Sequence, residues 1–401
     1  MAGFDHDIII VGGGIHGAGC AQAAAAQGYN VLVLEQHALA HGTSSRSSKL
    51  IHGGLRYLES GQFALVRECL QERRRLLQNA PGLVHLIPFH IPIYEQTTRR
   101  PWQIRSGLAL YALLSGLEHS GLFSTVPKRQ WAELDGLQTT GLQQVFRYYD
   151  AQTDDAALTR AVMQSAISLG AELAMPATFD GAELDDHGCR VRYLHQGRTI
   201  RRRGRIMINA TGPWAPQVLV RVMPVQPAIP IELVQGTHIV LPGSLVQGCY
   251  YMEAPSDRRA IFAMPWRQQT LVGTTETPFH GDPSAIVPLP QEQDYLLQTA
   301  GHYFPAYRNL GRGAIQSSFA GLRVLPGGAG TAFGRPRETV MHCDRATNTR
   351  LLTLYGGKLT AYRATADKVM QLLRATLPPR PRQADTRMIR LIDSDTYDSP
   401  R

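Results

Sequence analysis

The sequence predicts an α/β fold, and three segments in which a strand ends in a glycine turn carry that prediction. They begin near Ile8, Ile206 and Leu351, far apart in the chain. Short apolar strands that end in small residues are typical of parallel strands whose carboxyl ends approach a ligand. With 401 residues, 43% of them apolar, the chain is long enough for two domains or one discontinuous pair.

The first segment is the strongest local signal. Its parts follow in chain order: strand Ile8–Val11, glycines Gly12, Gly14 and Gly17, helix Ala18–Gln27, strand Val31–Leu34, and Glu35. Such a turn lets backbone N–H groups and a helix N-terminus meet a pyrophosphate, while a carboxylate after the second strand binds ribose hydroxyls. The segment predicts an ADP-binding site, with a helix packed on a sheet through small residues as the alternative. Its place at the N-terminus favours FAD over NAD.

The other two segments resemble the first in part. Ile206–Asn209 ends at Ala210, Thr211 and Gly212, which taken alone is an ordinary strand end. Leu351–Tyr355 leads into Gly356-Gly357 and a helix expected from about Leu359, with apolar residues on one face. Bare N–H groups at such a helix start stabilise negative charge, as on a reduced flavin.

Composition narrows the class of protein. Charged residues make up 18% of the chain, which argues against disorder. The net charge of +9 is compatible with binding to nucleic acid, to an anionic lipid surface or to an acidic substrate. We expect no nucleic-acid partner, because the chain has neither a lysine-rich tail nor a zinc-ligand spacing. No metal site is expected either.

Compartment signals point to the cytoplasm. Five scattered cysteines and an N-terminus without a basic signal-peptide region predict a reduced chain that is not exported. The apolar stretch Gly107–Leu117 is too short to span a bilayer and predicts a buried helix, or at most an interfacial one.

The basic run Arg198–Arg205 predicts an exposed hairpin edge, with anionic lipid contact as the alternative. Arg73–Arg75, on a predicted helix Phe63–Gln78, are interpreted as a solvated face.

Five blocks, in order, resemble one family. "VGGGIHGAGCA", "GTSSRSSKLIHGGLRYLE", "NATGPW", "QGTHIVLP" and "YGGKLTAYR" are similar to blocks of the FAD-dependent glycerol-3-phosphate dehydrogenases, and the resemblance runs from residue 5 to about 375. It implies a glutathione-reductase-type, Rossmann-like FAD-binding domain interleaved with a mixed-sheet α+β substrate domain. The expected FAD-binding parts are 1–80, 150–225 and 315–380. The substrate parts are 81–149 and 226–314, and 381–401 form a tail.

The resemblance also implies a reaction and its residues. Glycerol 3-phosphate is oxidised at C2 to dihydroxyacetone phosphate by hydride transfer to flavin N5, and electrons pass to a quinone or another acceptor. A peripheral position on the inner face of the cytoplasmic membrane is the alternative to a wholly cytoplasmic one. The residues implied for the cofactor are Gly12, Gly14, Gly17, Glu35, Thr43, Ser44, Ser45, Ser48, Lys49, Leu50, Ala210, Thr211, Gly212, Gly357, Lys358 and Leu359. Those implied for the substrate and its chemistry are His52, Arg56, Tyr57, His238, Arg323, Lys358 and Thr360.

The chemistry of these side chains agrees with an anionic alcohol. Arg56, Arg323 and Lys358 supply three cations for a phosphate dianion. A neutral imidazole suits removal of the hydroxyl proton, with His52 as first choice and His238 as second. Only four lysines occur among 41 basic residues, yet Lys49 and Lys358 fall inside the motifs, which predicts that these positions require lysine.

Three departures from the family pattern weaken the substrate assignment. The chain ends at Arg401 without the expected helical C-terminal domain, Ala361 replaces a threonine, and Val324 followed by "PGGAGTAFGRP" replaces a proline and an acidic loop. One alternative is a 2-hydroxy-acid or amino-acid oxidase of the same superfamily, in which Arg56 or Arg323 clamps a carboxylate. A non-catalytic flavin-binding protein is the other.

Overall fold

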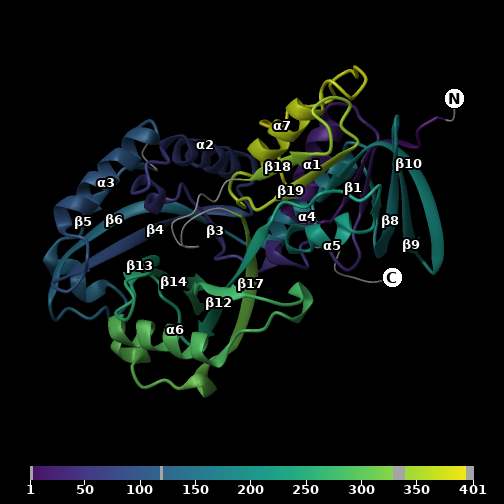
Figure 1. The fold of residues 1–401 in the computed structure, drawn as a ribbon. Coiled ribbons are helices and arrows are strands. Elements are labelled where there is room, and N and C mark those ends of the chain that lie inside the picture. Colours follow the sequence, from purple (N-terminus) through teal and green to yellow (C-terminus); the bar gives the residue numbers. More distant parts are fainter. Residues whose placement is uncertain (1–2, 118–120, 328–338, 394–401) are drawn as a thin grey trace.

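A computed structural model describes residues 3–117, 121–327 and 339–393 (Figure 1). Two large sheets organise these residues. Strands of the first sheet are β1 (His6–Val11), β2 (Val31–Leu34), β7 (Glu172–Ala174), β8 (Ala177–Asp185), β9 (Gly188–His195), β10 (Arg198–Asn209), β11 (Val222–Met223), β18 (Val340–Cys343) and β19 (Leu351–Tyr355). Strands of the second are β3 (Leu50–Ile51), β4 (Val84–Tyr94), β5 (Ser124–Thr125), β6 (Leu142–Thr153), β12 (Ile231–Leu241), β13 (Cys249–Glu253), β14 (Ala260–Trp266), β15 (Gln269–Gly273), β16 (Thr277–Phe279) and β17 (Ser317–Pro326).

The first sheet has a parallel centre. β1 lies between β2 and β10 and runs parallel to both, and β19 continues the parallel set beyond β10. Alternate residues of β1 enter different cores, since Ile8 and Ile10 face one cluster and Ile9 and Val11 face another. Three helices pack on the Ile8 side: α1 (Ile15–Ala26), α4 (Asp155–Ser168) and α7 (Tyr362–Leu373). Figure 1 shows α1 beside α7, although they stand at opposite ends of the sequence. The predicted α/β class is confirmed.

Two predicted helix starts were displaced. α1 begins at Ile15, directly after Gly14, and so starts earlier than the predicted Ala18. α7 begins only at Tyr362, because Gly356 and Gly357 both have positive φ and the chain turns again before the helix starts. Both helix N-termini therefore follow a glycine turn at the carboxyl end of a strand.

The second sheet is mostly antiparallel, and its longest pairings join β4 to β6 and β12 to β17. It carries α2 (Phe63–Asn79), α3 (Pro101–Leu114) and α6 (Pro290–Tyr303), and short α5 (Ala215–Leu219) follows the first sheet's β10. The predicted domain boundaries stay a prediction. Sheet membership differs from them, since β3 and β17 belong to the second sheet although residues 1–80 and 315–380 were grouped with the FAD-binding parts.

Three surface predictions have different outcomes. Arg73 is 2% exposed and forms an ion pair with Asp150, so its assignment to a solvated face was wrong. The apolar stretch Gly107–Leu117 is helical as far as Leu114. The prediction of a buried helix was wrong, because Leu113 and Leu117 are each 61% exposed, and the interfacial alternative stays a prediction. The basic run lies in the β9–β10 hairpin, largely exposed, as expected. None of the helices in the described ranges combines the length and apolarity needed to cross a bilayer.

The described part of the segment predicted as a tail packs against one helix of each sheet. Gln383 and Ala384 donate backbone hydrogen bonds to the carbonyl of Ala26 at the end of α1. Leu391 donates to the carbonyl of Asn79 at the end of α2 and is 6% exposed. This segment therefore forms hydrogen bonds with two helices that pack on different sheets.

Candidate active site

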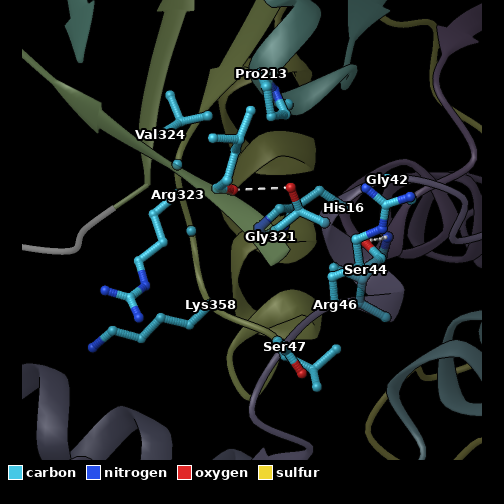
Figure 2. A pocket seen from close by; sticks show the side chains of 18 of the residues that line it. His16, Gly42, Ser44, Arg46, Ser47, Pro213, Gly321, Arg323, Val324 and Lys358 are labelled. Carbon is cyan, nitrogen blue, oxygen red and sulfur yellow. Dashed lines mark hydrogen bonds between the residues drawn. The ribbon is translucent and has the colours of Figure 1, made fainter. Parts of the chain in front are cut away.

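A cavity of about 730 Å³ is lined by residues of both sheets. It brings together most of the predicted site residues: Gly12, Gly14, Glu35, Thr43, Ser44, Ser48, Leu50, His52, Arg56, Tyr57, Ala210, Thr211, Gly212, His238, Arg323, Gly357, Lys358, Leu359 and Thr360. Gly17, Ser45 and Lys49 are not among the lining residues in the described part of the chain. Figure 2 shows the region between Pro213, Ser44 and Lys358.

One end of the cavity is a cradle of small residues at the start of α1. A Cβ on Gly12, whose φ is +108°, would lie 2.8 Å from the carbonyl oxygen of Ala210. The backbone N–H of Gly13 donates to Glu35 Oε2 at 2.7 Å, and that of Ile15 donates to Ser44 Oγ at 2.9 Å. This end can accept a bulky phosphate-containing group close to the main chain.

Gly17 has a packing role instead. A Cβ there would lie 1.9 Å from the carbonyl oxygen of Gly12, so α1 can rest on the glycine turn only without a side chain at this position. It shapes the cradle without lining it.

Lys49 anchors the wall from behind. Its Nζ lies 2.6 Å from Asp155 Oδ1 and donates to the carbonyl of Ser45 at 2.5 Å, with only 5% of the residue exposed. Ser47 donates to the other oxygen of Asp155 through its backbone and its hydroxyl. The segment is thereby fixed so that the neighbouring Ser48 faces the cavity.

The Gly53-Gly54 turn presents the next residues. A Cβ on Gly53 would lie 2.5 Å from Tyr111 Oη, and one on Gly54, at φ +78°, would lie 2.2 Å from the ring of Tyr57. The N–H of Gly53 donates to Tyr111 Oη at 2.8 Å, and that hydroxyl donates to Asp150 Oδ2. Only glycines therefore let the chain turn here and carry Arg56 and Tyr57 to the cavity.

Six arginine or lysine residues of the described chain line the cavity: Arg46, Arg56, Arg221, Arg259, Arg323 and Lys358. Arg323 Nη1 donates to Glu276 Oε1 at 2.5 Å. Lys358 Nζ lies 3.7 Å from the centroid of the Tyr57 ring, is buried, and has no hydrogen-bond partner among the described residues. Figure 2 shows Arg323 and Lys358 extending to the same side of the cavity. A buried ammonium with unused donors is suited to an anion.

Two histidines of the cavity are held neutral. Burial, with Arg323 and Lys49 nearby, lowers the pKa of His238 to about 3, and its ring stacks on Phe319. His238 Nε2 lies 2.9 Å from Ser48 Oγ. Burial also lowers the pKa of His16 to about 4, beside Gly357. The backbone N–H of His52 donates to Thr360 Oγ1 at 3.2 Å, which joins the second of the five blocks to the last.

Several lining residues had no signal in the sequence. Arg259, Glu276 and Tyr251 belong to no recognised motif, and only the pairing of distant strands brings them to the site. Among the departures, Val324 lines the cavity, whereas Ala361 is 5% exposed and is not among its described lining residues. Most of the segment after Pro326 lies outside the described residues.

Comparisons with known proteins agree with this geometry. The FAD dependent oxidoreductase family model matches residues 7–363. D-erythritol 1-phosphate dehydrogenase of Brucella abortus is 34% identical over 381 residues, covering 93% of this chain and 74% of that protein. Glycerol-3-phosphate dehydrogenase of Pseudomonas aeruginosa is 36% identical over 384 residues, covering 92% and 71%. The structure of glycerol-3-phosphate dehydrogenase from Bacillus halodurans complexed with FAD has a TM-score of 0.74 at 27% identity, covering 96% and 67%.

The cradle fits FAD. It offers a glycine turn without side chains at the start of α1, with the N–H of Gly13 held by the carboxylate that follows the second strand, next to a cavity large enough for the rest of the cofactor. The residues, the matched family and the FAD-containing relative lead to one conclusion. The chain belongs to the FAD-dependent oxidoreductase family.

Proposed function

We propose that this protein oxidises a small polyol phosphate, with glycerol 3-phosphate as the first candidate and D-erythritol 1-phosphate as the second. The observation that carries the proposal is the convergence of Arg56, Arg323 and Lys358 on one cavity, with the Lys358 ammonium lacking a hydrogen-bond partner among the described residues. Relatives named for these two substrates are similar at nearly equal identity, so the choice between them is made by experiment.

In this proposal the charged residues bind and the histidines handle the proton. Lys358, Arg56 and Tyr57 hold the phosphate, because charge-assisted hydrogen bonds from cations bind a dianion strongly. His52 takes the proton of the C2 hydroxyl, and the neutral imidazole of His238 forms a hydrogen bond with the oxygen on the same carbon. FAD supplies the hydride acceptor when it is bound. Glycerol 3-phosphate would give dihydroxyacetone phosphate.

Flavin reduction tests the function directly. The yellow protein is mixed anaerobically with glycerol 3-phosphate, D-erythritol 1-phosphate, 2-hydroxyglutarate, glycine or sarcosine, and the oxidised flavin absorbance is followed. Bleaching by a phosphate ester supports the proposal. Bleaching by carboxylates alone would replace it with the 2-hydroxy-acid or amino-acid oxidase, and no bleaching by any donor would favour a flavin-binding protein without turnover.

We further propose a quinone as acceptor and a peripheral contact with the inner membrane surface. Support for the membrane contact comes from α3 and the residues that flank it. Trp102 and Leu113 of the helix are 68% and 61% exposed, and Leu117 after it is 61% exposed. Arg105, and Arg100 just before the helix, are exposed as well. Exposed apolar and aromatic side chains flanked by arginine suit an anionic bilayer surface.

Vesicle binding tests this contact. The protein is expected to sediment with phosphatidylglycerol-containing vesicles, and a Trp102→Ser/Leu113→Ser variant is expected to stay in solution. Val246→Ser, which removes an apolar side chain that is 78% exposed elsewhere, serves as the control. Equal sedimentation of all three proteins would reject α3 as the contact. Reduction of a soluble quinone analogue by the substrate-reduced protein tests the acceptor.

A further inference from the structure

Glu276 lies in the cavity wall between β15 and β16 and contacts two arginines. Its carboxylate accepts from Arg323 Nη1 at 2.5 Å, and its main-chain carbonyl accepts from Arg259 Nη1 at 2.9 Å. The Glu276 side chain is only 10% exposed. Arg323 comes from β17 and Arg259 from just before β14, so one residue holds guanidinium groups from two separate strands at the cavity.

The neighbours of Glu276 explain why it faces the cavity. Thr275 and Thr277 donate their hydroxyl hydrogens to Glu292 Oε1 at 2.8 Å and 2.7 Å. In an extended chain alternate side chains point to opposite sides, so two threonines held on one side direct the residue between them to the other.

Glu292 fixes this connection to the strand that carries His238. Its Oε2 accepts from Gln235 and Thr237 of β12 at 2.7 Å and 2.6 Å. Burial opposes ionisation of Glu292, but these hydrogen bonds outweigh it and keep the pKa of the carboxyl below its usual value. A buried, ionised carboxylate with this many donors is a rigid support for Glu276.

Arg323 is thereby held over β12 next to His238. A Cβ on Gly236, two residues before His238, would lie 3.0 Å from Arg323 Nη2, and Arg323 contributes to the low pKa of His238. The direction of this guanidinium therefore decides where it can meet a ligand lying above His238. Figure 2 shows the Arg323 side chain extending from its strand toward the side reached by Lys358.

We propose that Glu276 is a positioning residue of the substrate site, which fixes Arg323 as a directed hydrogen-bond donor beside His238. The phosphate charge is then met by Arg56 and Lys358, since Glu276 already balances the charge of Arg323. This inference rests on the proposed function and assigns different tasks to the three cations that the sequence grouped together.

Three variants test it: Glu276→Gln, Glu276→Asp and, as a matched control, Glu253→Gln. Glu253 is similarly buried and contacts Arg99 and Arg258, but it does not line the cavity in the described residues. For Glu276→Gln, kcat/KM with glycerol 3-phosphate is expected to fall about 10- to 100-fold, the loss of a hydrogen bond to a charged group. Glu276→Asp should recover part of it, and Glu253→Gln should match the parent protein.

A second readout separates positioning from charge. The affinity for inorganic phosphate, followed by perturbation of the flavin absorbance, should change less than about threefold in Glu276→Gln, because Arg56 and Lys358 are intact. Tighter phosphate binding with unchanged kcat would overturn the inference, since Glu276 would then only repel anions. A lower Tm with unchanged kinetic constants would overturn it as well.

The failure of the proposed function is recognised separately. If no phosphate ester bleaches the parent protein, the function fails, and crystal structures of the flavin-loaded parent and Glu276→Gln then decide the inference. A reoriented Arg323 guanidinium supports it, and an unmoved one rejects it.

Discussion

The two ends of the cavity differ in the kind of atoms that form them. The cofactor end consists mainly of main chain: glycines without room for a Cβ, and N–H groups of Gly13 and Ile15 that donate to Glu35 and Ser44. The substrate end consists of charged side chains, which come from the turn before α2, from the residue before β14, from β17 and from the turn before α7. A short contiguous segment therefore determines the shape of the cofactor end. The charged side chains of the substrate end come together only when the whole chain folds.

This difference affects how each end tolerates change. A glycine cradle fails sterically, because any side chain overlaps backbone atoms that cannot move far. A cluster of cations fails electrostatically and by degrees, because the remaining charges still attract the anion. Substitutions at the cofactor end should therefore change FAD content and stability, whereas substitutions at the substrate end should change the KM for the substrate.

The largest effect is expected from Gly17→Ala. The new Cβ would lie 1.9 Å from the carbonyl oxygen of Gly12, so α1 must shift away from the cradle. We expect a colourless preparation and a loss of about 3 kcal/mol in unfolding free energy. The measurements are the ratio of flavin to protein absorbance and urea denaturation.

The matched control for that variant is Gly107→Ala in α3, where an added Cβ meets nothing within 4 Å. It should keep FAD and gain up to about 1 kcal/mol, because alanine favours a helix more than glycine does. Full FAD content in Gly17→Ala would show that the cradle is less rigid than its close contacts indicate.

The same difference explains what sequence could predict. The strand, turn, helix and carboxylate from Ile8 to Glu35 are contiguous, so their spacing alone predicted the ADP-binding unit. The largest displacement of a boundary was the start of α1, at Ile15 where Ala18 was predicted. Arg259, Glu276 and Glu292 meet through pairings of β12, β15, β16 and β17, which no local pattern reveals. Their roles had to come from the fold.

The scarcity of lysine was informative but ambiguous. It marked Lys49 and Lys358 equally, since both stand where arginine would be the usual basic residue of this chain. Lys49 forms a buried ion pair with Asp155, whereas Lys358 lines the cavity. Composition can indicate that a position requires a compact ammonium, but burial and partners decide whether the reason is structural or functional.

An intermediate effect, confined to the substrate end, is expected from Lys358→Ala. Loss of the buried ammonium should raise the KM for glycerol 3-phosphate about 10- to 100-fold, the range for hydrogen bonds to a charged group, while FAD stays bound. Lys368→Ala is the control, because Lys368 of α7 is half exposed and pairs with Glu68 of α2 outside the cavity lining of the described residues. Steady-state kinetics decides, and an unchanged KM in Lys358→Ala would remove this residue from the phosphate site.

The smallest effect is expected in how the free energy of unfolding depends on pH. One buried histidine from each end of the cavity contributes to it. His16, at the cofactor end, and His238, at the substrate end, have pKa values lowered by burial to about 4 and about 3, from a usual value of 6.5. Below pH 6.5 the unfolded chain therefore binds protons that the folded chain does not, and each histidine lowers stability by up to about 1.4 kcal/mol per pH unit until its folded pKa is reached. Unfolding free energies measured by urea denaturation from pH 7 to 5 should fall less steeply in His16→Gln and in His238→Gln than in the parent protein. Equal slopes in all three proteins would mean that water reaches these imidazoles and that neither end of the cavity is as dry as its packing indicates. A reduced slope in only one variant would instead locate the drier end of the cavity.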